Sequence, residues 1–157
     1  MELSVFLNRL ICALVAGILI GLERQLRQRN AGLVTNSLVA VGACIFILTS
    51  ESVILATTAD RPNFDNLRVL SQIVTGIGFL GAGVIMKDGL TIHGLNSAAT
   101  LWCSAAVGSL CGFGMWREAI VASIVILFIN WILRYIERKI AERAQDKFNK
   151  EDHPEKK

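Results

Sequence analysis

Charged side chains are scarce in this chain, and the few that occur stand in short clusters between long apolar runs. Lys, Arg, Asp and Glu make up 18% of its 157 residues, and hydrophobic residues make up 53%. The net charge of +3 is too small to indicate a nucleic-acid partner. The mean hydropathy of +0.51 is high for a soluble domain, whose helices would be amphipathic. The composition therefore predicts a protein that crosses the lipid bilayer several times.

The motifs of several catalytic and binding classes are also missing. No G-x-x-x-x-G-K-[ST] loop occurs, which argues against an ATP-driven pump. Residues 76–81 fit G-x-G-x-x-G, but both flanks are apolar and no acidic residue lies between Asp88 and Glu118. The four cysteines fit no C-x-x-C pattern and are expected to be small buried hydrophobes. We expect no bound nucleotide, no cofactor and no enzymatic activity.

Five apolar runs indicate the fold, and they cover residues 5–22, 34–55, 69–86, 97–115 and 118–133. At about 1.5 Å per residue, the longer runs cross a hydrocarbon layer of about 30 Å. We predict an all-α, polytopic membrane bundle of about five transmembrane helices in residues 1–133. A cytoplasmic amphipathic helical tail is expected over residues 134–157. The short fourth and fifth runs leave a re-entrant hairpin as an alternative.

The basic residues indicate the orientation of these spans. If the N-terminus lies outside, 12 Lys and Arg residues fall on the inner side of the membrane and 4 fall on the outer side. Cytoplasmic loops of membrane proteins are enriched in Lys and Arg. The distribution therefore predicts an outer N-terminus and a cytoplasmic C-terminus.

The stretch from Gln72 to Trp102 is the one around which we expect the bundle to be organised. Four glycines leave one side of its first run almost without side chains, so this side is expected to pack closely against a neighbouring helix or a second copy of the chain. Two G-x-x-x-G pairs, in the first and fourth runs, predict further close packing. The predicted packing glycines are Gly17, Gly21, Gly76, Gly78, Gly81, Gly83, Gly108 and Gly112.

Polar residues are expected to gather at the cytoplasmic ends of the spans. The polar loop of residues 87–96, which contains Lys87 and His93, is expected to meet the end of the first span. Carboxylates and amides suit a hard cation such as Mg²⁺, but the arginines oppose one, so metal binding is left open. For Asn96, a helix N-cap is an equally good explanation. The predicted functional junction consists of Glu23, Arg24, Arg27, Asn36, Asp88, Asn96 and Thr100.

Two ionisable residues lie within apolar runs, near the outer surface. Arg9 is about one turn into the first run, and Glu51 is about one turn from the end of the second. Antiparallel spans bring the two to the same level, where pairing would reduce the cost of burying either charge. The alternative is that Arg9 extends toward the headgroups and Glu51 lies at the interface.

Four blocks of sequence carry a family resemblance: GLERQLR from Gly21, AGLVTN from Ala31, GIGFLGAGVIM from Gly76 and GLNSAATLW from Gly94. In this order they resemble the MgtC/SapB family of bacterial inner-membrane proteins. The resemblance implies five spans, a periplasmic N-terminus and a cytoplasmic C-terminus. It also implies a role in adaptation to low magnesium and, in some pathogens, in virulence, exerted through regulation of other membrane proteins.

The chain departs from the family pattern in two places. Longer members carry a folded cytoplasmic domain after the spans, so this chain resembles a short form. The family usually has Arg-Thr-His where this chain has Val34-Thr35-Asn36, which removes a charge and an imidazole from the polar junction.

Two functions are consistent with these features. The first is a non-catalytic regulator whose small-residue faces pack against other integral membrane proteins or form a homo-oligomer. The alternative is a magnesium transporter or channel-like carrier, since glycine-rich helices and intramembrane polar groups suit a carrier too. Against a carrier, no acidic residue lies in the middle of a span.

Overall fold

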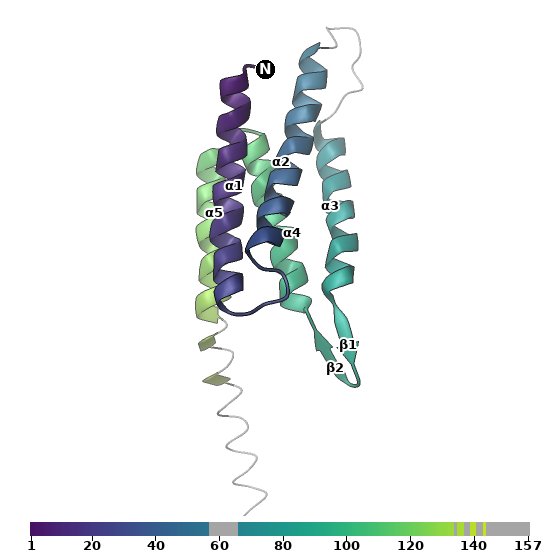
Figure 1. Ribbon diagram of the computed structural model, residues 1–157, viewed down its shortest axis with the longest axis vertical. Helices are drawn as coiled ribbons and strands as arrows, with labels where there is room; N and C mark the ends of the chain where they lie inside the picture. The colour runs from purple at the N-terminus through teal and green to yellow at the C-terminus, as the bar shows by residue number, and fades with distance from the viewer. Residues whose placement is uncertain (57–65, 134, 137–138, 141–142, 144–157) are drawn as a thin grey trace, which may run out of the picture.

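The computed structural model describes residues 1–56, 66–133, 135–136, 139–140 and 143. Helix α1 (Leu3–Leu26), α2 (Leu33–Ala56), α3 (Asn66–Val84), α4 (Leu95–Gly112) and α5 (Trp116–Phe128) run up and down in turn (Figure 1). A π-helical segment, Ile129–Leu133, continues α5. The predicted polytopic helical bundle is therefore confirmed. Most of the expected tail, residues 134–157, lies outside the described residues.

Helix α4 is the central element of the bundle. Ten of its 18 residues are buried, and it packs against α1, α2, α3 and α5. The segments with the length and hydropathy of a membrane span are α1, Leu33–Ile54 of α2, α3 and Trp116–Leu133. Because α4 is enclosed by other helices, it presents little surface to lipid and can contain serine, threonine and glycine instead of large apolar side chains.

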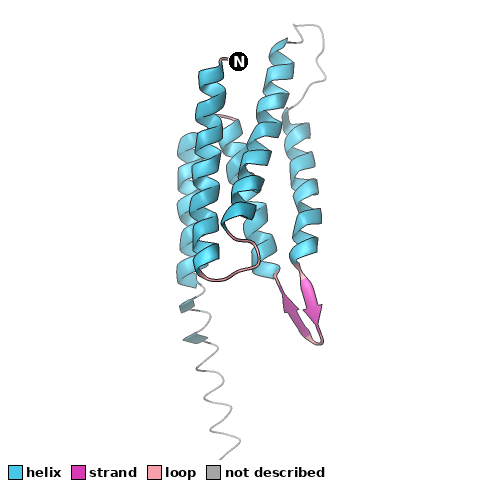
Figure 2. Ribbon diagram, viewed as in Figure 1, coloured by secondary structure: helices cyan, strands magenta, loops and turns pink. Residues whose placement is uncertain are grey.

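The polar loop expected after the third run is a β-hairpin (Figure 2). Strand β1 (Met86–Asp88) pairs antiparallel with β2 (Thr91–His93), and both strands are exposed. Gly89, with φ of 58°, begins the two-residue turn, the position at which type II′ turns place glycine. Strands of three residues are too short for an alternating pattern to show in the sequence, which explains why the hairpin was not expected.

Two apolar clusters form the core, one on each side of α4. The first joins α1, α2, α4 and α5 through Ala13, Ala16, Ile20, Cys44, Leu48, Val107, Cys111 and Ala119. The second joins α2, α3 and α4, together with the loop before α2, through Ala31, Ala43, Ile77, Leu101 and Ala105. Many members are alanine or cysteine, whose small size lets the helix backbones approach one another.

The two G-x-x-x-G pairs lie where helices are closest. A methyl group at Gly17 would lie 2.7 Å from the Ser37 Cα atom, and one at Gly21 would lie 2.7 Å from the Leu33 Cα atom. On α4, a methyl at Gly108 would lie 2.7 Å from the Ala40 Cα atom, and one at Gly112 would lie 2.7 Å from Ile47 Cβ. Both pairs therefore face α2.

The glycines of α3 are placed differently. A methyl group at Gly76, Gly78 or Gly83 would meet nothing within 4 Å, and one at Gly81 would make an ordinary contact with Ala98 at 3.5 Å. Three of the four therefore do not make, within the described residues, the close packing expected of them. Contact with a second copy of the chain stays a prediction.

Candidate functional site at the hairpin end of the bundle

Arg24, in the last turn of α1, is the centre of a polar junction between three segments of the chain. The residue is only 1% exposed. Its Nη1 donates to Asn96 Oδ1 at 2.6 Å, its Nη2 donates to Ser97 Oγ, and its Nε reaches the Ala31 carbonyl oxygen at 3.4 Å. A cation at this place also faces the negative end of the α1 dipole. The guanidinium thus holds α1 to the start of α4 and to the α1–α2 loop.

Asn36 continues the junction on α2. Its Nδ2 donates to the carbonyl oxygens of Ala31 at 3.1 Å and Gly32 at 2.8 Å, and its Oδ1 accepts from Ser104 Oγ at 2.8 Å. Asn36 and Ser104 are both fully buried. Because Arg24 and Asn36 share the Ala31 carbonyl, the α1–α2 loop connects the two halves of the junction.

Asn96 does not cap α4, which corrects that explanation of its position. The N-cap is Gly94, with φ of 89° and no side-chain cap hydrogen bond, so Asn96 already belongs to the helix. Glycine is required at position 94, because a methyl group there would lie 2.9 Å from the Val84 carbonyl carbon in a left-handed conformation. The side-chain amide oxygen of Asn96 instead accepts from Arg24, and the backbone carbonyl oxygen of Asn96 accepts from the hydroxyl of the buried Thr100 at 2.8 Å.

Glu23 and Arg27 form a separate pair beside the junction. Arg27 Nε lies 2.7 Å from Glu23 Oε1, one helical turn away on α1. Both carboxylate oxygens of Glu23 are enclosed, and the contact is an ion pair without an aligned hydrogen bond. Arg27 also borders a cavity of about 300 Å³ lined by Trp131, Ile132 and Tyr135 after α5.

Asp88 lies outside the junction. It is exposed on β1, near the hairpin turn, and Lys87 on β1 and His93 on β2 are exposed too. The structure therefore brings together Arg24, Asn36, Asn96 and Thr100, places Glu23 and Arg27 next to them, and leaves Asp88 apart. Within the described part of the chain, no three His, Cys, Asp or Glu residues gather closely enough to hold a metal ion.

Two serines in the junction were not predicted. Ser97 accepts from Arg24, and Ser104 donates to Asn36. The signal in the sequence is their spacing of seven residues, which puts them on one face of a helix together with Thr100 and Leu101. Serine on such a face indicates a helix buried by protein rather than by lipid.

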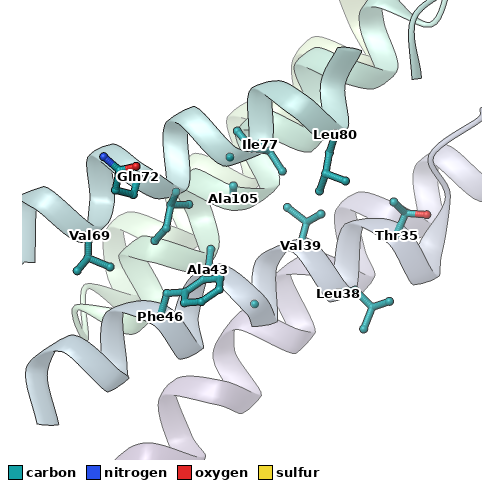
Figure 3. Close-up of a pocket in the computed structure, with 13 residues that line it drawn as sticks. Thr35, Leu38, Val39, Ala43, Phe46, Val69, Gln72, Ile77, Leu80 and Ala105 are labelled. Carbon is teal, nitrogen blue, oxygen red and sulfur yellow. The ribbon is translucent and has the colours of Figure 1, made fainter. Parts of the chain in front are cut away.

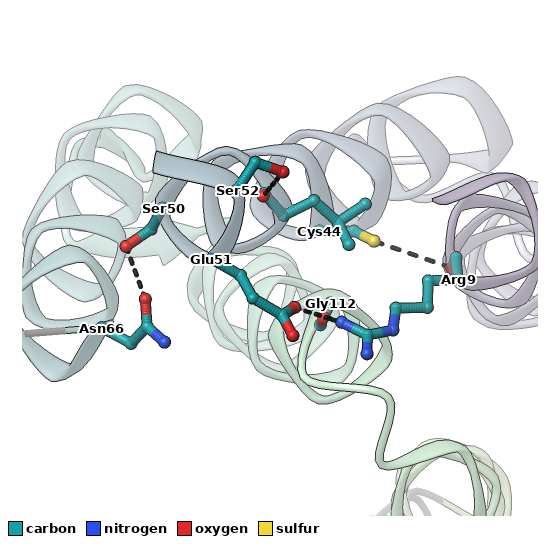
Figure 4. Close-up of polar contacts among 8 residues, drawn as sticks. Arg9, Cys44, Ser50, Glu51, Ser52, Asn66 and Gly112 are labelled. Atoms are coloured by element: carbon teal, nitrogen blue, oxygen red, sulfur yellow. Dashed lines mark hydrogen bonds and ion pairs between the residues drawn. The ribbon is translucent and has the colours of Figure 1, made fainter. Parts of the chain in front are cut away.

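At the opposite end of the bundle, Arg9 and Glu51 form the ion pair considered from the sequence (Figure 4). The same guanidinium nitrogen of Arg9 also donates to the Gly112 carbonyl oxygen at 2.8 Å. Three helices, α1, α2 and α4, are thus joined by one side chain. Nearby, Ser50 Oγ donates to Asn66 Oδ1 at 2.6 Å and connects the end of α2 to the start of α3.

A groove of about 590 Å³ separates α2 from α3 (Figure 3). Val39, Phe46 and Leu80 are among its apolar lining residues, and Ala105 of α4 also lines it. Thr35 and Gln72 contribute its polar atoms. Its composition is that of a surface in contact with hydrocarbon.

Comparison with known proteins agrees with this architecture. Residues 10–139 match the MgtC family. The chain is 52% identical over 135 residues to Protein MgtC of Salmonella typhimurium strain LT2, covering 86% of this chain and 55% of that protein. It is 54% identical over 122 residues to Protein MgtC of Brucella abortus strain 2308, covering 78% and 48%.

An uncharacterized protein of Synechocystis is 52% identical over 134 residues, with 85% of this chain and 54% of that protein covered. The chain spans about half the length of the curated relatives it matches. No solved structure matches it. From the family match and these identities, the chain belongs to the MgtC family.

Proposed function

We propose that this protein is a non-catalytic regulator of other integral membrane proteins that acts in bacterial adaptation to low magnesium. The family resemblance supports the physiological role. The buried Arg24 junction is the observation that carries the molecular role, because a permanently charged guanidinium occupies its centre and donates to Asn96, Ser97 and the Ala31 carbonyl. A guanidinium repels a divalent cation, so the junction is unsuited to binding magnesium. Its hydrogen bonds instead hold three segments of the chain in a fixed arrangement, which a partner protein could recognise.

The experiment that tests this role compares two substitutions at Asn96. Asn96→Ala removes the acceptor of the 2.6 Å bond from Arg24, whereas Asn96→Asp keeps an oxygen there and adds a charge opposite to that of Arg24. We expect growth in low magnesium to be lost with Asn96→Ala and largely kept with Asn96→Asp, at equal membrane levels. Full growth with Asn96→Ala would contradict the assignment of the site.

An ion carrier is the second candidate, and the Arg9–Glu51 pair is the observation in its favour. Ionisable groups inside a membrane commonly mark ion or proton pathways. Arg9 also bonds to Gly112 of the central helix, so breaking the ion pair would affect the contacts of α1, α2 and α4 together. Magnesium flux into liposomes that contain only this protein, abolished by Glu51→Gln, would favour the carrier over the regulator.

The proposed location is the bacterial inner membrane, with a periplasmic N-terminus and a cytoplasmic C-terminus. The distribution of Lys and Arg supports this orientation. In it, the Arg24 junction faces the cytoplasm and the Arg9–Glu51 pair lies near the periplasm. Fusions of a periplasm-only reporter at residue 62 and at residue 150 test it, and reporter activity at residue 150 would reverse the assignment.

A further inference from the structure

Two cysteines that stand 99 positions apart in the sequence meet inside the bundle. The thiol of Cys111, on α4, donates to the sulfur of Cys12, on α1, across 3.2 Å. Neither forms a disulfide in this structure. The two sulfur atoms are therefore in direct contact, between helices that also belong to the same apolar cluster.

The surroundings of this pair keep the two thiols together. Arg9, one turn before Cys12, donates to the carbonyl of Gly112, the residue that follows Cys111. Gly112 itself is packed closely against Ile47 of α2. Because α1 and α4 are held at this level by contacts other than the thiols, a bond between the sulfurs requires little further ordering of the chain.

The two thiols differ in access. Cys12 is partly exposed and lines a cavity of about 280 Å³ between α1 and α5, whose other lining residues include Ala16, Ala119 and Leu127. Cys111 is only 1% exposed. A small uncharged reagent in the apolar cavity therefore meets Cys12 first, and Cys111 stands behind it as the resolving thiol.

We propose that Cys12 and Cys111 form an oxidisable dithiol site that takes a neutral hydroperoxide as its oxidant and joins α1 to α4 by a disulfide. The sulfur of Cys12 attacks the terminal peroxide oxygen and the O–O bond breaks. The thiol proton of Cys12 passes to the departing alkoxide, which leaves an alcohol and a Cys12 sulfenic acid. The Cys111 sulfur then attacks the Cys12 sulfur, the S–O bond breaks, and hydroxide leaves with the Cys111 proton as water. In total, the two thiols lose two electrons and two protons, and the hydroperoxide is reduced to an alcohol and water.

The other two cysteines of the chain serve as matched controls. Cys44 lies in the same apolar cluster, but its thiol donates to the carbonyl of Arg9 at 3.6 Å. Cys103 lies on α4 as Cys111 does, but it belongs to neither core cluster. We expect the Cys12–Cys111 contact to stay in place when either residue is replaced by serine.

The test uses the full chain in liposomes, treated with cumene hydroperoxide and then denatured for thiol counting with a maleimide-linked polymer. We expect two of the four thiols to be lost, dithiothreitol to restore them, and peptide mass spectrometry to connect Cys12 with Cys111. Cys44→Ser and Cys103→Ser should still lose two thiols. Cys111→Ser should lose only one, as a sulfenic acid that dimedone traps.

Three results would overturn the site. They are four free thiols after treatment of the wild type, a disulfide that maps to another pair, and loss of two thiols in Cys111→Ser. Serine and alanine variants at position 12 are compared by thermal unfolding in detergent, because a variant that unfolds would expose every thiol. If both unfold, the wild-type peptide map alone decides the outcome.

Discussion

Helices α3 and α4 flank the same hairpin and carry four and two glycines, yet α3 lies at the edge of the bundle and α4 at its centre. Only Ile77 and Gly81 are buried on α3, whereas ten residues are buried on α4. A methyl at Gly78 would meet nothing within 4 Å, and one at Gly108 would collide with the backbone of Ala40. A glycine therefore permits another helix to approach closely, but the sequence does not show whether a neighbouring backbone lies there.

The hydrogen bonds of serine and threonine distinguish the two helices more clearly than the presence of glycine does. On α4, Ser97 and Ser104 bond to other segments, and Ser109 donates to the Ala105 carbonyl of its own helix. On α3, Ser71 and Thr75 bond only within the helix, at exposed positions. A hydroxyl that reaches another segment requires that segment beside it, so the polar content of α4 is a consequence of its central place.

The largest effect is expected from Gly108→Ala. The added methyl would lie 2.7 Å from both the Ala40 Cα and carbonyl carbon atoms, and backbone cannot move aside as a flexible side chain can. We expect a loss of stability of more than about 3 kcal/mol or failure to accumulate in the membrane. Gly83→Ala, with open space around it, is the control for thermal unfolding in detergent. Equal unfolding temperatures for the two variants would contradict the conclusion that the glycines of α4 are closely packed and those of α3 are not.

Gly94→Ala is expected to have the next largest effect, since this residue connects the hairpin to α4. Its φ of 89° costs an L-residue about 1–3 kcal/mol, and the methyl would also approach the Val84 carbonyl carbon to 2.9 Å. The control is Gly89→Ala, which has φ of 58° and no atom within 4 Å. Thermal unfolding should therefore show a clearly larger loss at position 94 than at position 89.

These positions show how much the sequence could predict. The spans were predictable because lipid requires long apolar runs, and the Arg9–Glu51 contact could be considered because charges are rare inside them. The face that a membrane-spanning helix turns inward could not be predicted, because apolar side chains suit contact with lipid as well as contact with protein. The stretch from Gln72 to Trp102 was expected to organise the bundle, and in the structure this role falls to α4, which begins within the stretch, and not to α3.

The candidate site was predictable in part for the same reason. Arg24, Asn36 and Asn96 stand out as polar residues at span ends. Arg24 bonds directly to Asn96, and it shares the Ala31 carbonyl oxygen with Asn36. The position of Asp88 could not be predicted, because it lies on the β-hairpin, which the sequence did not indicate and which places it away from the helix ends. The role of Ser104 depended on which side of α4 faces α2, and only tertiary packing determines that.

Ser104→Ala should have a moderate effect. It leaves the fully buried Oδ1 of Asn36 without the hydrogen bond from Ser104, which costs about 1–3 kcal/mol. Ser109→Ala is the control, because Ser109 is also buried on α4 but bonds only to its own helix. We expect unfolding in detergent to show a loss for position 104 and almost none for position 109. Equal losses would mean that α4 is not held to α2 through this bond.

The smallest effect on stability is expected from Gly78→Ala. Beyond the backbone of its own helix, no atom of the described residues lies within 4 Å of the added methyl. Alanine favours a helix over glycine by about 1 kcal/mol, so the unfolding temperature should stay the same or rise slightly. The variant separates two explanations of the α3 glycines. If they only face lipid, growth in low magnesium will be unchanged. If α3 packs against a second copy or a partner protein, a bulkier Gly78→Leu will lower cross-linking yield and growth while thermal stability is kept, and Gly81→Leu, next to Ala98 at 3.5 Å, will lower stability as well.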